Sequence, residues 1–164
     1  MLILAIDPGT NCGWCLREAS GRMTSGVWDL APKRHEGAGM RLIRLRTYLA
    51  EIAKAGLPAM VAYEEVRRHA GTTAAHVYGE IVGKIREWCE DNKVPYVGVP
   101  VATVKRTATG KGNADKEAMI DAALRKWPRT NDCDFQRYDD NEADARWIAE
   151  AAWAAYGAGA RTQP

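Results

Sequence analysis

The chain has 164 residues and a mass of 18.1 kDa, which is enough for one compact domain but not for two full ones. Hydrophobic residues make up 46% of it and charged residues 27%, a balance that excludes wholesale disorder. No run approaches the roughly 18 apolar residues of a membrane span. The apolar start ends at Asp7-Pro8 without a basic flank, which is not typical of a signal peptide. We therefore expect a cytoplasmic protein with no membrane partner, with one domain over residues 1–157 and a flexible tail at 158–164.

The net charge is only +2, but the charges are unevenly distributed. Residues 33–48 contain five basic residues and one acidic residue, and residues 101–130 contain seven basic and three acidic residues. The balancing acids lie in residues 132–144. A basic surface around an acidic focus is expected of a metal-dependent enzyme that acts on nucleic acid. Solvated helix faces would give the same charge pattern.

The four cysteines do not form a zinc pattern. Cys12 and Cys15 have C-x-x-C spacing, but a second ligand pair is missing and the three histidines show no matching spacing. A redox pair would normally open a helix, whereas these two lie in a strand-like stretch. We expect free or structural cysteines, in keeping with a reducing compartment.

Taken in order, the first part of the chain predicts three strands, a helix and a fourth strand. Residues 2–7 are continuously apolar, and turn signals separate them from strands at residues 13–16 and 23–30. Apolar residues at helical spacing predict a helix over residues 39–54, which Gly56-Leu57-Pro58 ends. Residues 60–64 form another apolar run that ends in acid.

The second part predicts one more strand and several helices. A helix over residues 73–92 leads to a strand at 94–99, and further helices are expected at 103–108, 115–127 and 140–156. This order, with strands that end in acid, favours a ribonuclease H-like α/β fold: a mixed five-stranded sheet with helices on both faces.

Acidic side chains follow two of the apolar strands and open the last helix. Asp7 ends the first strand, where Pro8-Gly9 turns the chain, and open α/β sheets bind ligands at this end of their strands. Glu64 and Glu65 end the fourth strand, and because alternation directs them to opposite faces, at most one can share a site with Asp7. Asp140 and Asp144 are an i, i+4 pair on one helix face, with Asn141 as the i, i+3 alternative. Glu142 projects about 200° away from Asp144 and so lies off that face.

Carboxylates from such distant segments would repel one another unless cations neutralised them. Hard oxygen ligands select Mg²⁺ or Mn²⁺, and two such ions about 3.5–4 Å apart can drive phosphodiester hydrolysis. Taken singly, the acids have simpler interpretations, because an aspartate at a helix end can be a cap and Glu64 can be a surface residue. Acids at two strand ends together with an aspartate-rich helix start favour the metal site.

Five segments resemble the RuvC-type Holliday junction resolvases, in the right order and over nearly the whole chain. The first is Ile3-Leu4-Ala5-Ile6-Asp7-Pro8-Gly9 followed by Gly13-Trp14, and the second is the acidic strand end Ala62-Tyr63-Glu64-Glu65-Val66. The third is the helix from Tyr78-Gly79-Glu80 towards Pro95-Tyr96. The fourth is Val104-Lys105-Arg106-Thr107 with Gly110-Lys111-Gly112-Asn113-Ala114-Asp115-Lys116, and the fifth is Asn141-Glu142-Ala143-Asp144-Ala145. Residues 17–36 and 128–138 are the main gaps. The resemblance leaves a bacterial and a phage-type member open.

The resemblance implies a homodimeric nuclease that resolves four-way junctions or other branched DNA with two Mg²⁺ ions per site, for which Mn²⁺ can substitute. It implies that Asp7, Glu64 and Asp144 are metal ligands and that Lys105 and Lys116 approach the phosphates of the cleaved strand. Further basic side chains are expected at the DNA: Arg67, Arg68, Arg106 and Lys111.

The chain departs from the family pattern at two positions. The family's fourth ligand, an Asp or His, falls on Asn141, and because a neutral amide binds Mg²⁺ more weakly we assign that role to Asp140. The alternative is that Asp140 is only the helix N-cap. Arg67 stands where some members have an aromatic residue that wedges the junction; it could instead stack on bases or grip phosphate.

Three other functions fit parts of the sequence. An actin-like nucleotide-binding protein shares Asp-x-Gly-Thr, but needs a second domain and a second phosphate motif. A proofreading exonuclease, another ribonuclease H-like nuclease, would place an acid where Gly9 stands. A non-catalytic module that binds branched DNA fits Asn141 but not three intact acids.

The two-fold symmetry of a branch point calls for two active sites in a two-fold dimer. The small, apolar face of the helix at residues 73–92 is the interface hypothesis, although core packing would also explain it.

Overall fold

The computed structural model describes residues 1–67, 71–129 and 137–157. Five strands form one mixed sheet in the order β3-β2-β1-β4-β5. β1 pairs antiparallel with β2 and parallel with β4, so the meander of β1, β2 and β3 continues into a parallel half. The strands are β1 (Leu2–Asp7), β2 (Asn11–Glu18), β3 (Met23–Asp29), β4 (Met60–Glu65) and β5 (Tyr96–Pro100).

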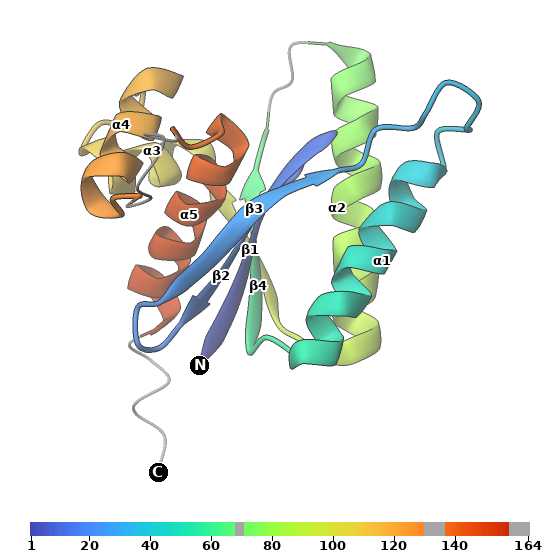
Figure 1. Cartoon of the computed structure of the whole chain (residues 1–164), viewed down its shortest axis with the longest axis horizontal. Coiled ribbons are helices and arrows are strands. Elements are labelled where there is room, and N and C mark those ends of the chain that lie inside the picture. The colour runs from blue at the N-terminus through green and yellow to red at the C-terminus, as the bar shows by residue number, and fades with distance from the viewer. Residues whose placement is uncertain (68–70, 130–136, 158–164) are drawn as a thin grey trace.

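Helices cover both faces of this sheet, as Figure 1 shows. One face carries α1 (Met40–Ala55) and α2 (Thr72–Asn92). The other carries α3 (Val101–Thr109), α4 (Lys116–Lys126) and α5 (Asp140–Ala152), and a π-helical turn at Trp153–Gly157 continues α5.

Period-two alternation along the central strand divides the core into two clusters. Ile3 and Ala5 of β1 pack towards α5, whereas Leu4 and Ile6 pack towards α1 and α2. All four side chains are fully buried, because helices cover both faces.

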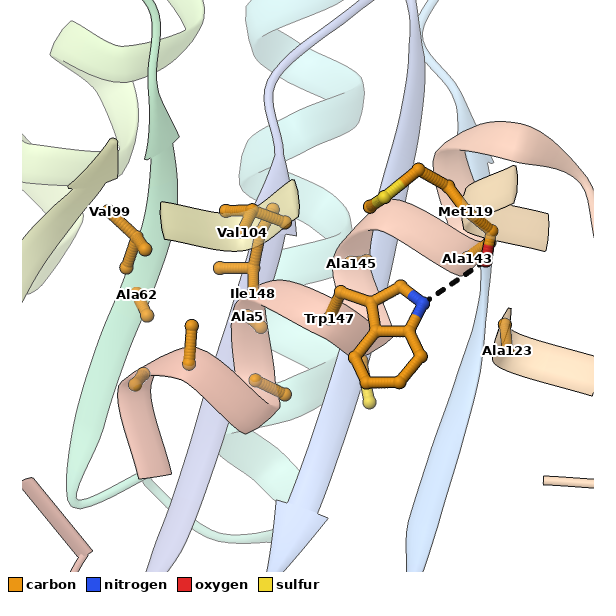
Figure 2. Packing of buried hydrophobic residues seen from close by; sticks show 14 of the residues in the cluster. Ala5, Ala62, Val99, Val104, Met119, Ala123, Ala143, Ala145, Trp147 and Ile148 are labelled. Atoms are coloured by element: carbon orange, nitrogen blue, oxygen red, sulfur yellow. Dashed lines mark hydrogen bonds between the residues drawn. The ribbon is translucent and has the colours of Figure 1, made fainter. Parts of the chain in front are cut away.

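The helix α5 is the centre of the first cluster. Ala145, Ile148, Ala149 and Ala152 are fully buried, and these mostly small side chains allow the helix to lie close to the sheet (Figure 2). Trp147 packs against Trp127, with 4.7 Å between the ring centroids. Its indole N–H donates to the carbonyl oxygen of Met119, and this hydrogen bond connects α5 to α4.

The fold class predicted from the sequence is confirmed, with small shifts in the element bounds. β5 begins at Tyr96 rather than at residue 94, because the backbone of Val94 takes part in the cap that follows α2. Lys93 takes a left-handed conformation there, and the Val94 N–H donates to the carbonyl oxygen of Cys89 at 2.9 Å.

The expectation that the apolar face of α2 forms a dimer interface is wrong. Ile81, Ile85, Trp88 and Cys89 all lie in the core between α2 and the sheet. The exposed side of α2 has small residues instead, including Gly79 and Gly83.

Cys12, Cys15 and Cys89 are free and buried, as expected of structural cysteines. Cys133 and the tail at 158–164 lie outside the described residues. No helix within the described ranges is both long and apolar enough to cross a membrane.

Candidate active site

Asp7 and Glu64 lie side by side at the carboxyl end of the sheet. β1 and β4 run parallel with Ala5 opposite Ala62 and Ile6 opposite Tyr63, so the next residue of each strand is one of these two acids. Alternation places both on the face covered by α5, since Ala5 and Ala62 belong to that cluster. Glu65 lies on the other side of its strand, where it packs on Gly98 and pairs with Arg67. Of the two adjacent glutamates, Glu64 is therefore the one that shares a site with Asp7.

The first turn of α5 brings the remaining acids to the same place. Its N-cap is Asp139, whose carboxylate accepts the backbone N–H of Asn141 at 2.9 Å. The helix approaches β2 at Gly13, the residue that pairs with Asp7. A Cβ atom at Gly13 would lie only 2.0 Å from the carbonyl oxygen of Asn141. A glycine at this position therefore allows the close approach of α5 to the strand next to Asp7.

Two pockets meet at these acids. The larger, of about 580 Å³, is lined by Asp7, the turn Pro8-Gly9-Thr10, Glu64 and the start of α2. The smaller, of about 130 Å³, lies between Glu64, Asp144, Lys105 and Lys116. Glu64 borders both, so the carboxylates face solvent-filled space next to basic side chains.

The acids disfavour one another's ionised forms. Burial, and then the charge of Asp144, raise the pKa of Glu64 to about 7. Burial and the charge of Asp140 raise the pKa of Asp144 to about 6. The pKa of Asp7 is also raised, by burial and then by Glu64, Asp144 and Asp140 in turn. These four carboxylates thus act on one another electrostatically, as a single site would require.

Asp140 differs from the other three in having a cation of its own. The ammonium of Lys116 donates to its carboxylate, and this contact lowers the pKa of Asp140 and raises that of Lys116. Since the N-cap is Asp139, the interpretation of Asp140 as merely the cap is wrong.

Asn141 and Glu142, the neighbours of Asp140, have other partners. The side-chain amide of Asn141 donates to Asp139 at 2.9 Å and to Asp140 at 3.3 Å. Glu142 is buried away from the site, where it accepts hydrogen bonds from Ser25 and Arg129, both at 2.6 Å. The expectation that Glu142 lies off the face of Asp144 is confirmed.

The basic residues predicted to contact DNA are placed at different depths. Lys105 lines the smaller pocket, and its positive charge offsets part of the rise in the pKa values of Glu64 and Asp144 that burial causes. Arg106 and Lys111 are exposed near it. Arg67 is exposed and pairs with Glu65 at 3.2 Å, and Arg68 lies outside the described residues.

The donor set suits a hard divalent cation, because every candidate ligand is a carboxylate and three of the four have raised pKa values. Within the described ranges, no three or more His, Cys, Asp or Glu side chains form a ready-made cage for a metal ion. Mg²⁺ does not need one, since it keeps several waters and is usually held by one or two carboxylates together with substrate phosphates.

The hydroxyl of Tyr78 makes a contact at the site that was not predicted from the sequence. It accepts the N–H of Val66 at 3.1 Å and donates to the carbonyl oxygen of Glu64 at 3.0 Å, which fixes the end of β4 to α2. Helical spacing alone assigns Tyr78 to an apolar face, so the sequence holds no signal for this contact.

Comparison with curated proteins finds relatives that share one name. The crossover junction endodeoxyribonuclease RuvC of Nitratidesulfovibrio vulgaris is 32% identical over 121 residues, which cover 71% of this chain and 72% of that protein. The RuvC of Parasynechococcus marenigrum is 27% identical over 158 residues, or 93% of this chain and 98% of that protein. No protein-family model matches the chain.

Solved structures agree in fold. T. thermophilus RuvC, in a complex with a Holliday junction substrate, superposes with a TM-score of 0.78 at 24% identity and 96% coverage of both chains. The yeast mitochondrial Holliday junction resolvase Ydc2 superposes with a TM-score of 0.57 at 18% identity, over 91% of this chain and 76% of that one. The length and identity of the match to the Nitratidesulfovibrio protein, together with the shared sheet and the acids at its edge, show that this chain belongs to the RuvC family of crossover junction endodeoxyribonucleases.

Proposed function

We propose that the chain cleaves four-way DNA junctions and related branched DNA by metal-dependent phosphodiester hydrolysis. The observation that carries this proposal is the meeting of Asp7, Glu64 and Asp144 from three separate elements on one face of the sheet, with raised pKa values in all three. Carboxylates in such an arrangement are costly for the fold and are expected where a cation binds.

Asp7, Glu64 and Asp144 would hold the metal, with Asp140 as the fourth ligand. Two Mg²⁺ ions, or Mn²⁺ in their place, would supply an activated water and stabilise charge on the leaving oxygen. Burial raises the pKa of Asp7, and so do the charges of Glu64, Asp144 and Asp140, which supports a role for Asp7 in holding the metal together with these three acids.

Lys105 and Lys116 would bind the phosphate that is cleaved. Both line the smaller pocket beside Glu64 and Asp144. Lys116 also holds Asp140, so its ammonium positions the fourth ligand as well as a phosphoryl oxygen. For this reason Lys116→Ala should slow cleavage more than it weakens binding.

Cleavage of a synthetic four-way junction in Mg²⁺, beside a linear duplex and an RNA–DNA hybrid, tests the proposal. The wild-type chain should cut the junction, Asp7→Asn and Glu64→Gln should bind it without cutting, and Glu65→Gln should retain most of the activity. A wild-type chain that binds junctions but never cuts them would support the non-catalytic module instead. Selective cutting of the hybrid would indicate a different ribonuclease H-like nuclease.

Full activity in Asp7→Asn would contradict the metal-site assignment. Loss of activity in Glu65→Gln with retention in Glu64→Gln would mean that the other face of β4 carries the site.

A further inference from the structure

The loop between β3 and α1 carries cations that the site described above does not use. Lys33, Arg34 and His35 are consecutive and exposed. Within the described ranges, no carboxylate lies at ion-pair distance from Lys33 or Arg34, whereas Arg41 pairs with Glu80 and Arg44 with Glu36. The loop therefore presents basic side chains that form no ion pair within the described ranges, although Lys33 still acts electrostatically on Glu36.

This loop is held in a fixed turn. The carboxylate of Glu36 accepts the backbone N–H of Lys33 at 2.7 Å and pairs with the guanidinium of Arg44 at 2.6 Å. The N–H of Glu36 donates back to the carbonyl oxygen of Lys33 at 2.9 Å. Glu36 thus closes the turn through its carboxylate and its backbone N–H, both of which bond to the backbone of Lys33. These hydrogen bonds fix the backbone that carries the side chains of Lys33 and Arg34.

The loop begins next to the active site. The N–H of Leu30, directly after β3, donates to the carbonyl oxygen of Thr10 at 2.9 Å, and Thr10 lines the larger pocket together with Asp7. From there the loop projects beyond α1 at the end of the sheet where β1 ends (Figure 1). The one acid at its base, Asp29, accepts the N–H of Ala31 at 2.9 Å.

These observations describe a cationic projection that starts at the catalytic edge and extends outward from it. We propose that Lys33 and Arg34 bind backbone phosphates of a duplex arm that leaves the branch point. The inference rests on the proposed function, since it presumes that branched DNA is the substrate. It concerns residues within 17–36, a segment to which the resemblance assigned no motif.

The salt dependence of junction binding tests this proposal. The logarithm of the binding constant falls with the logarithm of salt concentration by about 0.9 for each phosphate neutralised. The double variant Lys33→Ala/Arg34→Ala should lower this slope by about 1.8 and weaken binding roughly tenfold at moderate salt. Binding is measured by fluorescence anisotropy in EDTA, so that no cleavage occurs.

A matched control removes two charges at the other end of the sheet. Arg22 lies in the hairpin between β2 and β3 and Lys54 at the end of α1, and their side chains are 76% and 72% exposed. Arg22→Ala/Lys54→Ala should leave the slope unchanged. If both double variants had equal slopes, net charge alone would explain the effect and the proposal would be overturned.

Arm length provides a second measurement. Junctions with arms trimmed close to the crossover should reduce the difference between wild type and Lys33→Ala/Arg34→Ala, because the distant phosphates are missing. An undiminished difference would assign the loop to the crossover strands and not to an arm. In each case the wild-type chain must bind and cut the long-armed junction, and its failure to do so would count against the proposed function itself.

Discussion

The carboxylates of the active site are held in surroundings that favour their protonated forms. For Glu64, burial and the charge of Asp144 raise the pKa from a usual value of 4.5 to about 7. For Asp144, burial and the charge of Asp140 raise it from 3.8 to about 6. A folded protein that binds protons more tightly than its unfolded chain loses stability as those protons leave.

We therefore expect the metal-free protein to become less stable as the pH rises. The contribution of Glu64 and Asp144 is fully present below pH 4 and is lost between about pH 4 and pH 7, the window between the usual and the raised pKa values. Thermal unfolding in EDTA at several pH values measures the effect. Mg²⁺ should restore the melting temperature most at the high end of this window, because the ionised carboxylates bind it.

The double variant Glu64→Gln/Asp144→Asn is the control for this prediction. Neutral amides cannot lose a proton, so the melting temperature of this variant should fall less steeply over the same window. If its pH dependence equalled that of the wild type, other groups would be responsible.

Asp139 and Asp140 are adjacent in sequence but have different partners, and they can be separated experimentally. Asp139 caps α5 through the N–H of Asn141, whereas Asp140 pairs with Lys116 and raises the pKa values of Asp7 and Asp144. Asp139→Ala should cost about 0.5–2 kcal/mol of stability and leave turnover nearly intact. Asp140→Asn should melt near the wild-type temperature, lose turnover and require more Mg²⁺.

Asn141→Ala is the third member of this series. The amide of Asn141 donates to Asp139 and Asp140 and is not assigned as a metal ligand, so this variant should be nearly as active as the wild type. An inactive Asn141→Ala beside an active Asp140→Asn would assign the fourth ligand to the asparagine. Melting temperature and the Mg²⁺ dependence of cleavage distinguish these outcomes.

At the scale of elements, the site depends on how closely α5 lies against β1 and β2. Gly13 is the point of closest approach, because a Cβ atom there would lie 2.0 Å from the carbonyl oxygen of Asn141. The backbone fixes the positions of the Cβ atom and of the carbonyl oxygen, so a change of side-chain rotamer cannot relieve the clash. Either α5, which carries Asp140 and Asp144, or β2, which pairs with β1 at Asp7, has to move.

Gly13→Ala should thus displace the first turn of α5 from Asp7. We expect a loss of about 1–3 kcal/mol in the free energy of unfolding from overpacking. A displacement of about 1 Å can reduce the rate by roughly a hundredfold. Circular dichroism and single-turnover cleavage measure the two effects separately.

Gly83→Ala is the matched control, because a Cβ atom on that exposed helical glycine would meet nothing within 4 Å. It should stabilise α2 by about 0.4–1 kcal/mol. If Gly13→Ala kept the wild-type rate, the close approach of α5 would not be required for catalysis.

Local pattern was sufficient to predict the sheet and the elements that bring the candidate site residues together. The apolar runs that end at Asp7 and Glu64 predict both strands. Period-two alternation places Glu64 and Glu65 on opposite faces, and the family resemblance selects Glu64. Helical spacing likewise places Asp140 and Asp144 on one face.

The rest depends on contacts between elements that no local pattern encodes. The pairing of Lys116 with Asp140 requires α4 to dock on α5, and the burial of Glu142 requires Ser25 and Arg129 from distant segments. The alternative that Asp140 is the N-cap was wrong for a different reason: the adjacent Asp139 is chemically as well suited to that role, and only the helix geometry selects it. The apolar face of α2 was equally compatible with a core and with an interface, and its packing on α1 and the sheet decides for the core.

At the scale of the whole molecule, the described part of the chain has one cluster of candidate catalytic acids, whereas the proposed substrate, a four-way junction, has two equivalent strands to be cut. One chain acting alone would leave a nick. A two-fold dimer would place two sites symmetrically about the branch point, and we therefore propose that the chain acts as a homodimer.

Mixing active and inactive chains tests whether two sites act as a unit. If dimers exchange freely, wild-type chains mixed with an equal amount of Asp7→Asn should form doubly active dimers in about one quarter of cases. Paired incision of a junction should fall to that fraction, while single nicks accumulate from the mixed dimers. Sedimentation equilibrium provides the independent measurement of mass, with about twice 18.1 kDa expected. Independent monomers would instead sediment at the mass of one chain, and their nicking rate would fall only in proportion to the active fraction. In that case the two cuts would be separate events, and the symmetry of the substrate would not be matched by the protein.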